Sequence, residues 1–584
     1  MTFPKVGVAD WRAQVDKELA GASFDKTLVH TTPEGLAIQP LYVEATGDSG
    51  VPGAAPFTRG SAAAPAPFAI CMRHDAVDSD ALAADLDGGA DALWLQLGPN
   101  FGLESLFARA DWSKLQLVID GNGAPLAALD ALLAGADHAG VATSALRFVL
   151  AADPLADIAR GLASGTVEHG LAELVECARH VHERCPAAQG ALVSTLPYHA
   201  AGADAADELA IALSTGVAYL RALTDGGFEV ATAARQLAVQ ISVGRDTFGE
   251  LCKLRALRLV WHKLVRAAGA PDAPLARLHA VASPRTLSER DPWVNMLRVT
   301  TEVFSAVLGG ADLVTPAPFD DALGAASDLG RRVARNTGLV LRAESHLGRV
   351  VDAAGGSYYL ETLTDELARQ AWQRFRAIEA EGGIVRSLTD GKLQARLAAG
   401  WHKWSDGLAK RKESLTGVSV FANLDEKRPE PTQPQRAPAA SGAAPWPPLP
   451  RHRDAEAFER LRDRADELGA AVPVVGLVVL GPPSEYRPRL TFASSFFGGG
   501  GLRAREVAAD VVPAFACLCG SDERYAAEAA DRARALKAAG CQRVLLAGRP
   551  GAHEATLRAA GVDGFIFVGC DVVKTLAELL GAKS

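Results

Sequence analysis

A proline-rich stretch divides the sequence into two unequal parts. Eight prolines lie between Pro429 and Pro450, mixed with alanine, glutamine, serine and glycine. Because proline fixes its own backbone and lacks an amide hydrogen, such a stretch forms neither helix nor sheet and is typical of a semi-rigid linker. About 425 residues precede it and about 135 follow it, and each part is long enough to bury its own core. We therefore predict a linker over 426–452.

Short apolar runs alternate with helical patterns in the longer part. The runs lie at residues 67–73, 92–97, 115–120, 146–150 and 191–196. Such alternation predicts βα units and a parallel sheet. Together with the long helical patterns that follow, it favours an α/β fold, a (β/α)8 barrel of the TIM type with a helical extension, over 61–425. Residues 1–60, with a helix from Asp10 to Leu19, form an N-terminal arm that we expect to contact another subunit.

The shorter part repeats this alternation on a smaller scale. Apolar strands are predicted at 474–481, 512–519, 543–548 and 564–569, with helices near 500–509, 523–539, 551–560 and 571–581. The pattern predicts a doubly wound, flavodoxin-like domain over 453–584, in which a ligand lies beyond the C-terminal ends of the strands. The segment after the first strand is interpreted as a loop, and the glycines at 498–501 as a turn into the next helix.

Composition excludes several classes of function. With 60 basic and 69 acidic residues the net charge is −9, which is not the electrostatic pattern of a nucleic-acid-binding protein. The first residues lack the apolar segment of a signal peptide, and no run of 18 apolar residues occurs, so we expect no membrane partner and a cytoplasmic location. The eight cysteines show no spacing with histidine that would predict a metal site, and we expect reduced structural thiols.

Four segments identify a family. They are EGLAIQPLY with PFTRG (34–42 and 56–60), ELCKLRALRLVW (250–261), DPWVNMLRVTTEVFSAVLGGAD (291–312), and the long segment from RRVARNT to GGSYYLE (331–361). Taken together they resemble the adenosylcobalamin-dependent methylmalonyl-CoA mutase family, and the order of barrel, linker and flavodoxin-like domain agrees. Within them, Glu250, Lys253, Arg255 and Arg258 recur at helical spacing, and we interpret them as one solvated, ion-paired face.

The resemblance implies a cobalamin loop that this sequence lacks. In catalytic members the flavodoxin-like domain carries an Asp-x-His-x-x-Gly loop, whose histidine ligates cobalt and whose aspartate orients that imidazole. Between Pro473 and Ala509 there is neither aspartate nor histidine. The remnant is a degenerate loop containing Gly481, Gly498 and Gly499, for which we expect no cofactor or metal binding.

The barrel shows parallel losses. After Arg59-Gly60, catalytic members continue into a segment with tyrosine and tryptophan that contacts coenzyme A, whereas this chain reads SAAAPAPFAI. Two further pocket segments are represented by HAVASP (279–284) and LVTPAP (313–318), which lose most of their hydrogen-bonding groups. Tyr198 and His199 stand two positions late relative to the family's Tyr-His pair, so they remain weak catalytic candidates and we expect no catalytic residue in this chain.

The resemblance is to the small, non-catalytic subunits of two-subunit mutases. It implies a heterodimer in which a large catalytic subunit binds adenosylcobalamin and the acyl-CoA substrate and interconverts (R)-methylmalonyl-CoA and succinyl-CoA, while this chain stabilises it. The candidate interface residues are Trp11, Phe24, Leu41, Tyr42, Phe57 and Arg59. Two alternatives remain open: an acyl-CoA mutase active in its own right, and a regulatory module that binds coenzyme A or cobalamin.

Overall fold

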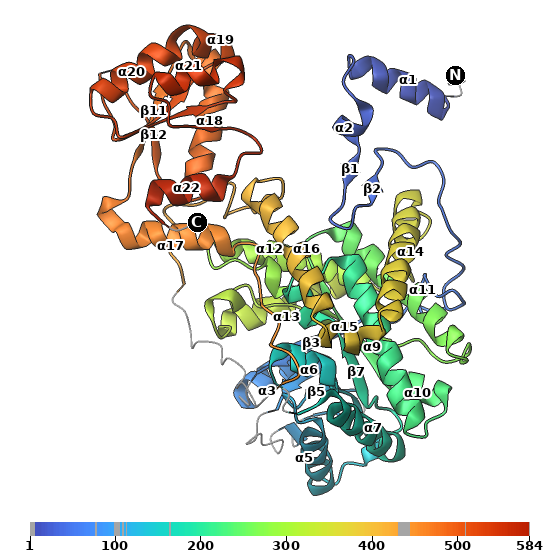
Figure 1. The fold of residues 1–584 in the computed structure, drawn as a ribbon. Coiled ribbons are helices and arrows are strands. Elements are labelled where there is room, and N and C mark those ends of the chain that lie inside the picture. Colours follow the sequence, from blue (N-terminus) through green and yellow to red (C-terminus); the bar gives the residue numbers. More distant parts are fainter. Residues whose placement is uncertain are drawn as a thin grey trace.

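Eight parallel strands form a barrel in the longer part of the chain (Figure 1). The computed structural model describes residues 6–75, 79–97, 106–107, 110–112, 114–162, 165–429, 444–508 and 510–582. The barrel strands are β3 (Ala69–His74), β4 (Ala92–Gln96), β5 (Gln116–Asp120), β6 (Arg147–Leu150), β7 (Ala191–Ser194), β8 (Leu237–Val243), β9 (Arg277–Ala282) and β10 (Leu313–Thr315). Their order is β6-β5-β4-β3-β10-β9-β8-β7. The edges meet where the Leu150 amide donates to the Gln189 carbonyl at 2.9 Å, which confirms the predicted barrel.

Helices surround this barrel and extend it. They are α3 (Ser79–Asp87), α5 (Pro125–His138), α6 (Pro154–Arg160), α7 (Val167–Arg184), α8 (Leu196–Ala200), α9 (Ala205–Asp225), α10 (Val230–Gln236), α11 (Thr247–Ala267), α12 (Trp293–Leu308), α13 (Asp328–Ala343), α14 (Tyr358–Ala380), α15 (Gly383–Thr389) and α16 (Lys392–Ala409). Helices α14, α15 and α16 follow the last barrel strand, and we call them the extension.

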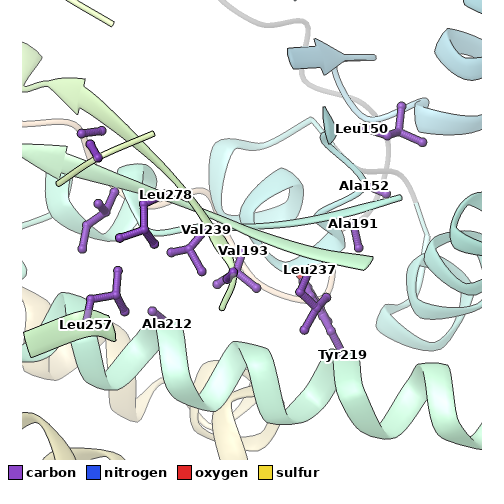
Figure 2. Close-up of a cluster of buried hydrophobic side chains, with 14 of the residues drawn as sticks. Leu150, Ala152, Ala191, Val193, Ala212, Tyr219, Leu237, Val239, Leu257 and Leu278 are labelled. Atoms are coloured by element: carbon purple, nitrogen blue, oxygen red, sulfur yellow. The ribbon is translucent and has the colours of Figure 1, made fainter. Parts of the chain in front are cut away.

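Side chains alternate between two cores along each barrel strand, because successive residues of a strand point to opposite faces. Those pointing outward pack under the helices. Figure 2 shows Val193 and Val239 on this outer side, together with Ala212 and Tyr219 of α9. Those pointing inward form two separate, smaller clusters inside the barrel, one of which includes Trp94 and the other Leu192.

Helix α11 carries charged side chains into the interior. Lys253, Arg255 and Arg258 are buried, because α9, α12 and α14 pack around α11. Arg255 pairs with Asp352 at 3.0 Å and with Glu361 at 2.9 Å. Within the face itself Lys253 pairs with Glu250 at 2.5 Å, so the predicted ion pairing is confirmed for these two residues, but the predicted solvation of this face is wrong. The prediction failed because charged residues recur at the same helical spacing whether the face is exposed to solvent or buried against other helices.

The N-terminal arm has an outlying end and an anchored base. Its elements are α1 (Val8–Glu18), α2 (Phe24–Leu28), β1 (His30–Thr31) and β2 (Ala37–Ile38). No residue of α1 is buried, and α1 lies apart from the barrel in Figure 1. The turn between β1 and β2 is fixed, since Glu34 accepts a hydrogen bond from the Ala205 amide at 3.1 Å and Lys403 donates to the Pro33 carbonyl at 3.0 Å.

The C-terminal domain is a five-stranded parallel sheet in the order β12-β11-β13-β14-β15, as a flavodoxin-like fold requires. Its strands are β11 (Val475–Val479), β12 (Ala504–Glu506), β13 (Phe515–Cys519), β14 (Arg543–Ala547) and β15 (Gly564–Ile566). Its helices are α17 (Glu456–Leu468), α18 (Pro483–Gly498), α19 (Asp522–Arg524) continued by a π-helical turn (Tyr525–Ala529) into α20 (Ala530–Ala538), α21 (Glu554–Ala559) and α22 (Val572–Leu580).

Two predictions for this domain are wrong. The segment after β11 is helix α18 and not a loop, and residues 504–506 form strand β12 where a helix was expected. The glycines at 498–501 therefore end a helix instead of beginning one, and Gly501 has a positive φ of 81° that suits the turn out of it. The sequence did not predict helix α18 because two prolines, Pro483 and Pro488, lie in its first two turns, and proline usually disfavours a helix.

The described part of the predicted linker packs on the barrel. Residues 430–443 lie outside the described residues, but Trp446 and Leu449 are buried in the main core. The C-terminal domain then docks on the segment between β9 and α12, where Arg290 pairs with Asp463 and Asp466 at 2.6 Å each. Within the described ranges, no helix is both long and apolar enough to cross a membrane.

Candidate functional site

The C-terminal ends of the barrel strands are where enzymes of this fold place their reacting groups. In this chain the interior below that end is crossed by a belt of side chains, Ser194, Gln240, His279 and Thr315. Ser194 Oγ lies 2.9 Å from Gln240 Oε1, Gln240 Nε2 lies 3.1 Å from His279 Nδ1, and His279 Nε2 lies 2.7 Å from Thr315 Oγ1. Trp94 packs edge to face on the imidazole at 5.7 Å.

Burial makes the belt a neutral structure. His279 is buried, and this desolvation lowers the pKa of its imidazole to about 3. Both ring nitrogens already have partners within the belt. The belt thus lines the inner wall of the barrel from β7 to β10 with groups that hydrogen-bond to one another.

A second network stands at the C-terminal end itself and is built around Glu208 of α9. His199 of α8 places Nδ1 2.9 Å from Glu208 Oε1 and Nε2 2.7 Å from Ser283 Oγ. Lys253 of α11 donates to the same carboxylate at 3.0 Å, and Ser242 donates to it at 2.8 and 2.9 Å. All five side chains are buried.

The charges of this network are set by their mutual contacts. Burial alone would raise the pKa of Glu208, but Lys253 and His199 hold it well below its usual value. Burial, reinforced by Arg285, lowers the pKa of His199 to about 4. The imidazole is therefore neutral at pH 7, and its two nitrogens are bonded to Glu208 and Ser283. A proton exchange with a ligand would require breaking one of those bonds.

Tyr198 and His199 occupy different surroundings although they are adjacent in the sequence. The Tyr198 hydroxyl is buried and has no hydrogen-bond partner among the described residues, and burial raises its pKa well above the usual value. The structure brings His199 together with Glu208, Ser283 and Lys253. None of these three residues was predicted to lie next to His199. Ser283 lies in the segment 279–284, which was expected to lose most of its hydrogen-bonding groups, and its hydroxyl is one that the segment keeps.

The C-terminal ends of the strands in the small domain are also filled by the chain itself. Strand β11 ends next to Gly481, and α18 begins two residues later. Glu485 of α18 pairs with Arg524 at 2.8 Å, and a β-carbon on Gly481 would lie 2.7 Å from the carboxylate of Glu485. Arg489 donates to the carbonyl of Ala547 at 2.7 Å. These side chains occupy the edge where the fold places a ligand.

The residues present do not fit the cobalamin loop of the resembling family. The segment from Pro473 to Ala509 contains no histidine that could ligate cobalt. The described residues also contain no cluster of three or more histidine, cysteine or carboxylate side chains that could hold a metal ion. Gly498 and Gly499, assigned to the degenerate loop, lie instead at the end of α18, so only Gly481 stands at the edge of the sheet.

A cavity of about 500 Å³ opens at the opposite, N-terminal end of the barrel. Arg277 and Arg235 line it together with Gln189 and Gln236. Arg277 also lines the narrow space inside the barrel below His279. The carboxylate of Asp312, which lies in the same cavity wall, accepts a hydrogen bond from the Leu278 amide at 2.7 Å. The cavity wall therefore combines two guanidinium groups and two amides with one carboxylate.

Two of the six candidate interface residues lie at the outlying end of the arm. Trp11 and Phe24 meet edge to face, with ring centroids 6.1 Å apart, and the guanidinium of Arg12 lies 3.6 Å from the Phe24 ring centre. This small aromatic cluster ties α1 to α2.

The other four candidates lie at the base of the arm, and three of them contact the body. These contacts are Tyr42 with Tyr359 at 5.2 Å, Phe57 with His262 at 5.0 Å and Arg59 with Asp352 at 2.9 Å. Leu41 remains 41% exposed. Nearby, Val43, Phe248 and Tyr358 are about half exposed, so an apolar surface continues from the arm onto α11 and α14.

Comparison with known proteins gives consistent matches. The methylmalonyl-CoA mutase family profile matches residues 77–471. The methylmalonyl-CoA mutase small subunit of Streptomyces virginiae is 40% identical, over 99% of this chain and 97% of that protein. The small subunit of Propionibacterium freudenreichii subsp. shermanii is 32% identical over 99% and 95%. The methylmalonyl-CoA mutase of Escherichia coli (strain K12) is 29% identical, over 71% of this chain and 64% of that protein.

Proposed function

The chain belongs to the methylmalonyl-CoA mutase family, and we propose that it acts there as a small, non-catalytic subunit that stabilises a catalytic large subunit in a heterodimer. The observation that carries the proposal is that both places where a ligand would bind, in the barrel and in the small domain, are filled by hydrogen-bonded side chains of the chain itself. Full-length similarity to proteins named small subunits supports the same role.

In this proposal the reaction belongs to the partner. The large subunit binds the acyl-CoA and adenosylcobalamin, whose cobalt–carbon bond supplies the radical that interconverts (R)-methylmalonyl-CoA and succinyl-CoA. The small subunit contributes a folded surface, and the assembly works in the cytoplasm. His199 neither touches substrate nor transfers a proton, because Glu208 and Ser283 occupy its nitrogens.

The arm is the proposed contact with the large subunit. Helix α1 buries none of its residues in the chain alone, and Leu41, Val43 and Phe248 leave apolar area exposed at its base. Exposed apolar surface of this kind drives association. We expect the isolated chain to self-associate, and sedimentation showing a stable monomer over a wide concentration range would count against this part of the proposal.

The decisive experiment compares the chain alone with the chain purified together with a large subunit. Each sample is incubated with adenosylcobalamin and methylmalonyl-CoA, freed of unbound cofactor, and examined by absorbance and by mutase activity. We expect a cobalamin spectrum and turnover only when the large subunit is present. Retained cofactor with turnover by the chain alone would establish the alternative, an enzyme active in its own right.

A second candidate function is supported by the cavity at the N-terminal end of the barrel. Its two arginines, Arg277 and Arg235, suit an anionic ligand such as the phosphates of coenzyme A, which favours the regulatory module over a purely structural role. Isothermal titration of the chain with coenzyme A tests this. Binding that Arg277→Gln weakens at least about tenfold would support the regulatory role, whereas no heat at millimolar ligand would reject it.

A further inference from the structure

At the end of the linker the chain crosses the C-terminal end of its own barrel. Three backbone amides mark the path: Leu449 donates to Ala159 at 2.9 Å, His452 donates to Ala200 at 2.9 Å, and Asp454 donates to Arg285 at 2.8 Å. The three acceptors stand in segments that follow β6, β7 and β9. Because the C-terminal ends of all barrel strands lie at one end, residues 446–454 pass over the rim of that end. We call these residues the strap.

Side chains fasten the first half of the strap to the barrel. Trp446 and Leu449 are only 4% and 7% exposed and belong to the main core of the barrel. Between them, Pro448 comes so close to Gly161 that a β-carbon there would lie 2.7 Å from the proline ring. Only a glycine at the end of α6 leaves room for this approach, and its φ of 77° also requires one.

The second half of the strap is fastened to the extension. The imidazole of His452 stacks on Trp401 of α16, with ring centroids 4.2 Å apart and an angle of 5°. Asp454 accepts a hydrogen bond from Trp404 at 2.8 Å and pairs with Arg245 at 3.5 Å. Helix α17 begins two residues later, so the strap also fixes the point from which the C-terminal domain starts.

One strap side chain, that of Arg451, interacts electrostatically with charged groups at the rim. Arg451 lies near Arg73 and Asp75 at the end of β3, near Asp321 after β10, and near Arg160 after β6. Burial and Arg73 together lower the pKa of Arg451. The strap therefore meets groups from strands on several sides of the barrel and does not run along one edge of the rim.

We propose that the strap is a built-in closure of the barrel: residues 446–454 occupy the rim in the isolated chain and keep small molecules away from the network around Glu208. The inference goes beyond the proposed function, since it assigns the closure to the linker and not to the loss of catalytic residues. It also requires no partner subunit. Restoring the lost residues without moving the strap would then leave the barrel closed.

Hydrogen exchange on the unmodified chain tests the closure first. The amides of Leu449, His452 and Asp454 are each donors to the rim, so we expect them to exchange at least about 100-fold more slowly than in an unstructured peptide of the same sequence. Exchange at the peptide rate in the folded chain would overturn the inference. This measurement needs no variant and no cofactor.

Limited proteolysis of a released strap gives the second test. In Leu449→Asp a charge replaces the buried anchor, and we expect trypsin to cleave after Arg451 and Arg453 at least about tenfold faster than in the parent chain, while circular dichroism shows the barrel still folded. Pro447→Ala, at an exposed neighbouring position, is the matched control and should be cleaved at the parent rate. Equal rates for a folded Leu449→Asp and the parent would refute the strap. Neither test reads activity, so failure here leaves the proposed subunit role standing.

Discussion

The barrel and the small C-terminal domain fill the same kind of place by different means. In the barrel the filling groups are fully buried charges, with Glu208 and Lys253 exposed by 1% or less. In the small domain the side chains at the corresponding edge remain partly exposed to solvent, with Arg489 31% exposed and its partner Asp522 74% exposed. A buried charge is stabilised almost entirely by its ion-pair partner, whereas a solvent-exposed charge is also stabilised by water. The two regions should therefore respond very differently to the loss of one side chain.

Removing the buried cation should have the largest effect. Lys253→Met leaves Glu208 without its ammonium partner, and we expect the free energy of unfolding to fall by about 3–5 kcal/mol. Lys263→Met on the same helix is the matched control, since Lys263 is exposed over the Trp372 ring, and it should cost less than about 1 kcal/mol. Urea unfolding of both variants measures the difference, and a similar loss in the two would contradict the comparison.

The belt should show its burial through pH. An imidazole whose folded pKa is about 3 binds a proton less readily than in the unfolded chain, so its contribution to stability is complete above its unfolded pKa and is lost as the pH falls below it. From pH 7 to 4.5, His279→Gln should lose about 2–3 kcal/mol less stability than the parent, at roughly 1.4 kcal/mol per pH unit.

The comparison of slopes isolates His279, because buried carboxyls with raised pKa, such as Glu302 at about 8, act in both chains alike. Denaturant unfolding at several pH values supplies the data. Parallel curves for the parent and His279→Gln would show that the imidazole is not held neutral by the fold.

A small effect is expected at the edge of the small domain. Arg489→Ala removes a partly exposed ion pair and one hydrogen bond to the Ala547 carbonyl, which also accepts from the Tyr525 hydroxyl at 2.8 Å. We expect a loss of about 1 kcal/mol or less that shrinks further at high salt. A loss as large as that of Lys253→Met would show that both edges rest on the same kind of interaction.

The smallest effect is expected on catalysis. Under the proposed division of labour, His199→Ala should leave the turnover of the assembled enzyme within about twofold of the parent at equal amounts of assembly, because both ring nitrogens of His199 are occupied by the chain itself. Loss of an acid–base group would instead cost about 100-fold or more. Gel filtration fixes the amount of assembled enzyme. A 100-fold loss with intact assembly would make His199 catalytic and overturn the proposed division of labour.

Sequence patterns predicted the architecture better than they predicted the surroundings of single residues. The barrel strands follow from apolar runs such as 92–97, because short apolar runs that alternate with helical patterns are typical of buried parallel strands. The burial of Lys253 and Arg255 could not be predicted, since the helices that cover them come from distant parts of the chain. Similarly, proline content predicts that 444–452 is neither helix nor sheet, but it carries no information on what Trp446 packs against.

The belt in the barrel has a further property, a single direction. In the structure the Ser194 hydroxyl donates to the amide oxygen of Gln240, so the amide nitrogen faces His279 Nδ1, and the imidazole then carries its hydrogen on Nε2 toward Thr315. The tautomer of His279 thus follows from the orientation of the Gln240 amide. The belt is polarised around part of the barrel from β7 to β10, and reversing it would require all four groups to turn together.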